Sequence, residues 1–212
     1  MQVAYRTEVG HVRSRNEDAL LARPELGVLA VADGLGGHAA GDVASATAVQ
    51  VLDEASLTGD STEADLRAAA DAAHQAVLRA ADEPDRAGMG TTVVLVALSD
   101  GLARVLHVGD SRAYLLEAAG RLVPVTEDHG VNGYLSQALG LDRGIEPDVV
   151  ELGTPPGSRL LLCTDGLTNM VEDRDVAELL GRGDAQEACD ALVEAALDNG
   201  GVDNVTVIVA AF

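Results

Sequence analysis

The stretch VLAVADGLGGHAAGD, residues 28–42, joins an apolar run to a glycine-rich turn that leads into a helix-like segment. Its Gly34, Gly36 and Ala39 match the GxGxxA fingerprint of dinucleotide-binding proteins, which also lies between a strand and a helix. Asp33 comes directly before the first glycine, however, and its carboxylate would repel a pyrophosphate. We therefore interpret this turn as part of a metal site, for which the rest of the chain has to supply further ligands.

Apolar runs without polar alternation recur along the chain and predict strands that are buried on both faces. They cover residues 27–32, 91–98, 159–163 and 204–211. Segment 101–125 predicts three more strands joined by tight turns. A large part of the chain is therefore expected to form β-sheet.

Three stretches have the periodicity of amphipathic helices, residues 40–56, 62–83 and 184–199. Thr62 and Asp65 resemble a capping box at the start of the second, and Asp184 suits the N-cap of the third. Two helices, a strand-rich middle, then a helix and a last strand favour stacked sheets flanked by helices. We predict one compact α+β domain.

The composition excludes several kinds of partner. The chain has 35 acidic residues against 14 basic ones, and its net charge of −21 argues against nucleic acid or an anionic membrane as the main partner. Cys163 and Cys189 form no CxxC motif, so we expect reduced thiols instead of a disulfide or a zinc site. With neither a signal-peptide core nor a run of about 20 apolar residues, the chain is expected to be cytoplasmic and to make no membrane contact.

Acidic residues recur at the ends of the predicted strands. One acid alone would be ordinary turn chemistry, but several at converging strand ends would repel one another severely without cations. Oxygen ligands select hard cations such as Mg²⁺ or Mn²⁺, and one shared carboxylate can bridge two of them. The candidate ligands are Glu17, Asp18, Asp33, Asp110, Asp165 and Asp203, together with the carbonyl of Gly34, which no side chain shields.

A series of motifs resembles the metal-dependent serine/threonine protein phosphatases of the 2C type, in the order of that family and over nearly the whole chain. The motifs are GHVRSRNED (10–18), VADGLGGHAAG (31–41), GMGTTVV (88–94), VGDSRAYL (108–115), TEDH (126–129), LSQALG (135–140), LLCTDGLTNMV (161–171) and DNVTVIV (203–209). The resemblance implies a four-layer α-β-β-α sandwich of two antiparallel sheets with helices outside. It also implies that residues 1–212 are a single phosphatase catalytic domain.

The resemblance implies a role for each candidate ligand. Asp33 bridges two catalytic Mg²⁺ or Mn²⁺ ions, Asp165 and Asp203 complete the site of the first ion, and Glu17 and the Gly34 carbonyl serve the second. Asp18 holds metal-bound water. Asp110, with Asp165, is similar to a third-metal site of bacterial members of the family.

The remaining roles concern substrate. By resemblance, Arg13 grips the substrate phosphate and His38 is the general acid. His129 of the TEDH motif is expected to order a loop, and His107 to be structural or exposed. Asn204 is expected to support the neighbouring metal-ligand loop.

The implied activity is hydrolysis of phosphoserine and phosphothreonine in proteins by a water that bridges two metal ions, in a monomer that opposes bacterial serine/threonine kinases. Two features depart from the family. The flap segment at 130–134 is unusually short, which predicts a more open cleft, and Glu8 stands where an aspartate is expected. Two alternatives stay open: a catalytically silent regulatory binding module, and a phosphatase of small phosphoesters.

Overall fold

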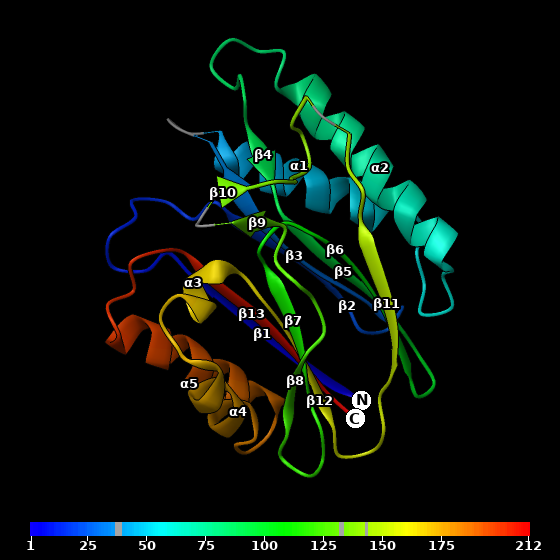
Figure 1. Ribbon diagram of the computed structural model, residues 1–212, viewed down its shortest axis with the longest axis vertical. Coiled ribbons are helices and arrows are strands. Elements are labelled where there is room, and N and C mark those ends of the chain that lie inside the picture. The colour runs from blue at the N-terminus through cyan, green and yellow to red at the C-terminus, as the bar shows by residue number, and fades with distance from the viewer. Residues whose placement is uncertain (37–39, 132–133, 143) are drawn as a thin grey trace.

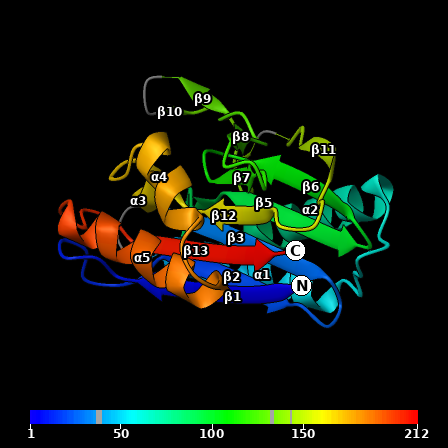
Figure 2. The ribbon, with the colours of Figure 1, turned by 90° about the horizontal axis from the view of Figure 1, so that it is seen from below.

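Two antiparallel sheets pack face to face in the computed structural model, which describes residues 1–36, 40–131, 134–142 and 144–212 (Figures 1 and 2). The five-stranded sheet has the order β1 (Gln2–Glu8), β13 (Val205–Ala211), β12 (Arg159–Cys163), β7 (Arg112–Leu116) and β8 (Leu122–Pro124). The six-stranded sheet has the order β11 (Asp148–Gly153), β6 (Leu102–Val108), β5 (Val93–Ser99), β3 (Val28–Leu35) and β2 (Asp18–Arg23), with β4 (Gly90–Thr91) paired to the end of β3. A separate ribbon joins β9 (Gly130–Val131) and β10 (Tyr134–Leu135).

Helices cover the outer face of each sheet, as Figure 1 shows. The six-stranded sheet carries α1 (Gly41–Glu54) and α2 (Glu63–Ala80), and the five-stranded sheet carries α3 (Asp165–Thr168), α4 (Asp173–Leu180) and α5 (Ala185–Asp198). This confirms the expected four-layer α-β-β-α sandwich. None of these helices combines the length and the apolar character that a membrane crossing needs.

Three layers of apolar side chains hold the sandwich together, and they explain why the strand sequences lack alternation. In β3, Leu29 and Val31 point into the core between the two sheets. Val28 and Ala30 of the same strand point to the core beneath α1 and α2. Because both faces of the strand are buried here, every position from Val28 to Ala32 is apolar.

The predicted helix starts are confirmed. The hydroxyl of Thr62 accepts a hydrogen bond from the backbone N–H of Asp65, and the Asp65 carboxylate accepts one from the backbone N–H of Thr62. Asp184 forms the same reciprocal arrangement with Glu187 at the start of α5. Each box satisfies backbone donors that the first turn of a helix leaves free.

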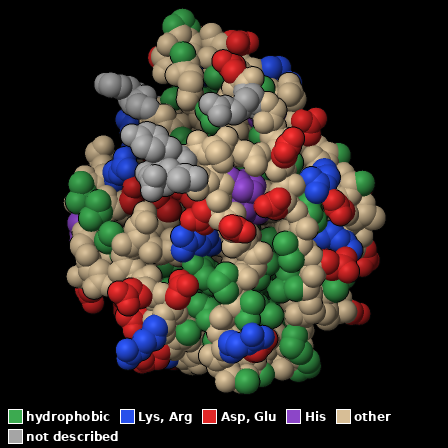
Figure 3. All heavy atoms as spheres, viewed as in Figure 1, with side chains coloured by type: hydrophobic (Ala, Val, Ile, Leu, Met, Phe, Trp, Pro, Cys, Tyr) green, Lys and Arg blue, Asp and Glu red, His purple; other side chains and the backbone are tan. Residues whose placement is uncertain are grey.

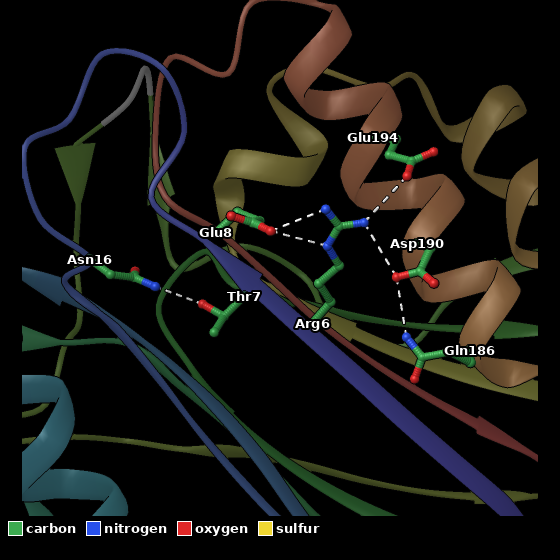
Figure 4. Close-up of polar contacts among 7 residues, drawn as sticks. All are labelled: Arg6, Thr7, Glu8, Asn16, Gln186, Asp190 and Glu194. Atoms are coloured by element: carbon green, nitrogen blue, oxygen red, sulfur yellow. Dashed lines mark hydrogen bonds and ion pairs between the residues drawn. The ribbon is translucent and has the colours of Figure 1, made fainter.

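The sequence pattern does not predict several elements, among them β1, β11, α3 and α4. The two strands are sheet edges, where polar residues replace the apolar run. Charged contacts fix β1 in place: Arg6 donates to Glu8 and pairs with Asp190 and Glu194 of α5 (Figure 4). Such contacts leave no periodic signal in the sequence.

Candidate active site

All of the predicted metal ligands except Asp18 line one pocket of about 340 Å³. Its lining, which we call the carboxylate pocket, consists of Arg13, Glu17, Asp33, Gly34, Leu35, Gly36, Asp110, Leu135, Asp165, Asp203 and Asn204. These residues come from β3 of the six-stranded sheet, from β10, from the start of α3 and from loops far apart in the chain. Figure 3 shows acidic side chains gathered near the centre of the face seen in Figure 1.

Asp33 lies inside a strand and does not end one, which differs from the sequence-based expectation. β3 continues to Leu35 because Gly34 and Leu35 pair with Thr91 and Gly90 of β4. The backbone of Asp33 is held at both polar groups, since its N–H donates to the Thr92 hydroxyl at 2.9 Å and its carbonyl accepts from the Thr91 hydroxyl at 2.9 Å. The carboxylate is therefore presented from a rigid position.

Asp18 lies directly opposite Asp33 on the neighbouring strand β2, just outside the residues that line the pocket. Its Oδ2 accepts hydrogen bonds from the hydroxyls of Thr164, at 2.9 Å, and Thr206, at 2.7 Å. Its Oδ1 is buried and has no hydrogen-bond partner among the described residues. Burial raises the pKa of Asp18 to about 7, although the two hydroxyls oppose the shift.

The carboxyls of the pocket raise one another's pKa. Burial is the largest cause of the raised pKa of Asp33, and the charges of Asp18, Asp165 and Asp110 add to it. Burial and the neighbouring Asp203 raise the pKa of Asp165, while burial and the neighbouring Asp165 raise the pKa of Asp110 to about 6. The cluster is therefore costly to ionise unless a cation neutralises it.

Glu17 and the Gly34 carbonyl lie together beside Gly41. A Cβ on Gly41 would be 2.7 Å from Glu17 Oε2 and 2.8 Å from the Gly34 carbonyl oxygen. A Cβ on Gly34 would be 2.1 Å from the Gly41 carbonyl oxygen, so no other residue fits there without a backbone shift. The two glycines thus allow a carboxylate and a carbonyl oxygen to converge.

Asn204 organises the loop that carries Arg13 and Glu17. Its amide nitrogen donates to the carbonyls of Val9 and Arg15, at 2.8 and 2.9 Å, and its amide oxygen accepts from the backbone N–H of Glu17 at 2.8 Å. This arrangement agrees with the supporting role expected for Asn204 in the sequence. Arg13 itself donates to Asp203 Oδ2 at 2.7 Å, with half of its side chain exposed.

Sequence reasoning missed the hydroxyls that hold Asp18. Thr164 and Thr206 belong to β-rich apolar motifs, and their spacing gives no sign that they converge on one carboxylate. His38, predicted as the general acid, lies outside the described residues. Both cysteines are free thiols and are buried.

The donor set fits hard divalent cations. Carboxylates and a backbone carbonyl converge in one pocket, and oxygen donors of this kind are those that Mg²⁺ and Mn²⁺ prefer. The unpartnered Oδ1 of Asp18 needs a water or an ion nearby, because buried polar atoms are otherwise satisfied. The raised pKa values of the neighbouring carboxyls point in the same direction.

Comparisons with known proteins give a matching family model and several similar relatives. The model of the family "Protein phosphatase 2C" matches residues 9–199. The chain is 37% identical to the serine/threonine protein phosphatase PstP of Mycobacterium tuberculosis (strain H37Rv) over 99% of its length, but it spans only 45% of that relative. It is 34% identical to the serine/threonine phosphatase stp of Listeria monocytogenes (strain EGD-e), covering 98% of the chain and 94% of the relative.

A solved structure of the PstP catalytic domain, in complex with two manganese ions, superposes with a TM-score of 0.90 at 36% identity. The match covers 98% of this chain and 96% of that one. The likeness therefore extends over the whole sandwich, including every strand that contributes to the pocket.

Proposed function

Because the chain belongs to the protein phosphatase 2C family, we propose that it hydrolyses phosphoserine and phosphothreonine in proteins. The observation that carries this proposal is the convergence of Glu17, Asp33, Asp165 and Asp203 in one pocket, with Arg13 at its side. In such a reaction water attacks phosphorus and the serine or threonine oxygen leaves with a proton. The Listeria and Mycobacterium relatives are named as serine/threonine phosphatases, and this supports the substrate class.

Two divalent ions would be held by the residues already described. By their places in the family motifs, Asp33 would serve both ions, Asp165 and Asp203 the first, and Glu17 and the Gly34 carbonyl the second. Asp110 would contribute to a third site next to Asp165, whose charge adds to burial in raising the pKa of Asp110 to about 6. When bound, such ions lower the pKa of water and stabilise the negative charge that develops on the phosphoryl group.

Arg13 is the group that we propose binds the substrate phosphate. A guanidinium donates two parallel hydrogen bonds to phosphate oxygens, and half of the Arg13 side chain is free to solvent. Its present partner, Asp203, would turn to a cation when one is bound, and that would release Arg13 toward the phosphate. Arg13 would then hold the phosphorus in line with the attacking water.

Asp18 would orient a water molecule, and His38 would donate a proton to the leaving oxygen. The buried Oδ1 of Asp18 would accept a hydrogen bond from water in the pocket and so orient it. By its place in the family motif, His38 would donate the proton to the leaving oxygen, a step worth roughly 10²–10⁴-fold in rate. Opposition to a serine/threonine kinase in the cell is part of the same proposal and follows from the substrate class alone.

The test is phosphate release from a phosphothreonine peptide, with Mn²⁺ and with a chelator. Wild type is compared with Asp165→Asn, which removes a ligand charge at little change in volume, and with Asp175→Asn, an exposed aspartate of α4. We expect Mn²⁺-dependent turnover in wild type and Asp175→Asn, and its collapse in Asp165→Asn. Absence of turnover in a wild-type protein that still binds Mn²⁺ would contradict the proposal and favour a silent binding module.

The alternative of small phosphoesters is separated by the same assay. Hydrolysis of a small aryl phosphate is measured beside the phosphopeptide under identical Mn²⁺ concentrations. A higher kcat/KM for the peptide supports a protein substrate. The reverse ranking would show that the pocket selects the phosphate group alone.

A further inference from the structure

Outside the carboxylate pocket, two histidines and an aspartate meet at the edge of the six-stranded sheet. His107 of β6 and Asp148 of β11 are direct cross-strand partners, so their side chains lie on the same face of the sheet. His129 reaches them from the loop before β9, with its Nε2 3.0 Å from Asp148 Oδ2. The ring centroids of the two histidines are 4.6 Å apart. We call these three residues the imidazole cluster.

His107 occupies a position that the fold otherwise fills with apolar side chains. Ala103 and Val105, on the same face of β6, belong to the core between the two sheets. The His107 side chain is 1% exposed, and neither ring nitrogen has a hydrogen-bond partner among the described residues. A buried polar group without a partner calls for a water or an ion that satisfies it.

We propose that His107, His129 and Asp148 form a second metal site, which binds Zn²⁺ or a similar transition-metal ion. One ligand atom from each residue lies within 4.8 Å of the other two. Around an ion with bonds of about 2.0–2.2 Å, ligand atoms stand roughly 3.3–3.5 Å apart, so the cluster has to close slightly. The exposed Asp148 and the loop residue His129 provide that movement, while His107 is fixed within the sheet.

The donor chemistry separates this site from the carboxylate pocket. Imidazole nitrogens favour Zn²⁺ and its neighbours in the transition series, whereas carboxylates and carbonyls favour Mg²⁺ and Mn²⁺. Burial lowers the pKa of His107 to about 4, so its ring is neutral at physiological pH, the form that binds metal. Three protein ligands also leave one position of a tetrahedral ion to water.

Binding needs one proton to move. His129 Nδ1 accepts a long, 3.3 Å hydrogen bond from the backbone N–H of Gly109, so Nε2 carries the proton that faces Asp148. An ion at Nε2 displaces that proton, the neutral ring then carries its proton on Nδ1, and the long contact with Gly109 is given up. The backbone N–H of His129 still donates to the Gly109 carbonyl at 2.7 Å, next to Asp110. The proposed ion is thus linked through one residue to the wall of the carboxylate pocket.

The test measures Zn²⁺ binding by equilibrium dialysis, with protein free of any histidine tag and with Mg²⁺ in large excess to fill the carboxylate pocket. We expect one equivalent of Zn²⁺ in wild type, and affinity at least tenfold weaker in Asp148→Asn and in His129→Gln. Asp148 is exposed and His129 lies in a loop, and circular dichroism is the check that both variants fold. Co²⁺ in place of Zn²⁺ gives a second readout, through the visible absorption of a tetrahedral site.

Two control variants locate the ion. Glu146→Gln removes an exposed acid two residues before Asp148 and should leave Zn²⁺ binding unchanged. Asp165→Asn should also retain Zn²⁺, whereas Asp148→Asn should retain Mn²⁺-dependent phosphate release. If Asp148→Asn and His129→Gln bind Zn²⁺ as wild type does, or if Asp165→Asn loses it, the ion lies elsewhere and the proposal is wrong. Wild type without stoichiometric Zn²⁺ would also overturn it.

Discussion

The carboxylate pocket and the imidazole cluster lie close together along the chain, since His107 and Asp110 flank the same strand end, yet their electrostatics are opposite. In the pocket, burial and like charges raise the pKa of Asp33, Asp165 and Asp110, which favours the protonated, neutral carboxyls. In the cluster, burial lowers the pKa of His107 to about 4, which favours the unprotonated, neutral imidazole. Burial disfavours the charged form in both regions.

One physical cause, burial away from water, makes both the carboxylates and the imidazole suitable ligands for a metal ion. Desolvation leaves the carboxyls in need of positive charge and leaves the imidazole neutral with a free electron pair. Each region also has buried polar atoms without a partner among the described residues, Asp18 Oδ1 beside the pocket and the His107 ring nitrogens within the cluster. A divalent ion relieves both conditions, but the donor atoms select different metals.

The largest expected effect is a loss of catalysis at the carboxylate pocket that leaves the imidazole cluster unaffected. Asp33→Asn should lower Mn²⁺-dependent phosphate release by at least about 10³-fold, or roughly 4 kcal/mol of transition-state stabilisation, because the central carboxylate of the pocket loses its charge. Zn²⁺ binding at the imidazole cluster should not change. Steady-state kinetics and dialysis on one preparation check both, with the exposed Asp71→Asn as the control. A variant within tenfold of wild type would show that Asp33 is not a central ligand.

The second effect concerns the metal-free pocket. The folded-state pKa of Asp18, about 7, lies above the ordinary value of about 3.9, so the folded protein holds an extra proton between these limits. The contribution of Asp18 to stability therefore falls as pH rises through that window. In a chelator at pH 8, Asp18→Asn should be more stable than wild type by on the order of 2 kcal/mol, or about 5 °C in Tm.

Thermal unfolding at pH 4.5 and pH 8 tests this sign. At pH 4.5 the two proteins should differ much less, because the wild-type carboxyl then keeps its proton. Added Mn²⁺ should stabilise wild type more than the variant and so reduce or reverse the order at pH 8. A variant that melts below wild type at pH 8 in chelator would refute the electrostatic account of Asp18.

A smaller effect is expected at Asn204, which contacts the pocket without carrying charge. Asn204→Ala leaves the Val9 and Arg15 carbonyls and the Glu17 N–H without their present partner, so the loop that positions Arg13 and Glu17 loosens. We expect about a tenfold lower kcat/KM, equivalent to about 1.4 kcal/mol. Zn²⁺ affinity should again be unchanged. A parallel loss at both regions would indicate a general folding defect instead.

The sequence predicts the pocket far better than the cluster, and the reason is local chemistry. Asp33, Asp165 and Asp203 follow or precede strongly apolar runs of sequence, so a one-dimensional pattern identifies them. His107, His129 and Asp148 have no such pattern, and only the pairing of β6 with the polar edge strand β11 brings two of them together. The sequence-based expectation that His107 is structural or exposed did not foresee that its ring nitrogens are buried without partners among the described residues.

The same contrast holds for the fold. Central strands and long helices were predictable because burial on two faces or on one stripe leaves a periodic record. The edge strands β1 and β11 and the short helices α3 and α4 were not, since their positions depend on contacts such as Arg6 with Asp190. Hydroxyl contacts to Asp18 are of the same kind, because Thr164 and Thr206 are ordinary strand residues until the sheet assembles.

The smallest expected effect is at His107, whose contribution to stability depends on pH in the direction opposite to that of Asp18. The folded-state pKa of His107 is about 4 and the ordinary value is about 6.5, so the unfolded chain binds the extra proton between these limits. Wild type in chelator should therefore lose stability as pH falls from about 6.5 toward 4. His107→Phe removes this dependence, and between pH 7.5 and pH 5 its stability should fall by about 1 kcal/mol less than that of wild type.

The pH dependence isolates His107 from the packing change that phenylalanine introduces. A change in packing shifts the free energy of unfolding equally at both pH values, whereas the protonation of His107 contributes only at the lower one. Urea unfolding at pH 5 and pH 7.5 gives the difference directly, and the double variant with Asp18→Asn removes the opposing titration from the same window. If His107→Phe and wild type show parallel pH profiles, His107 is not held neutral by burial. The two regions would then differ only in the type of donor atom, and no longer in the direction in which burial shifts the pKa of their ligands.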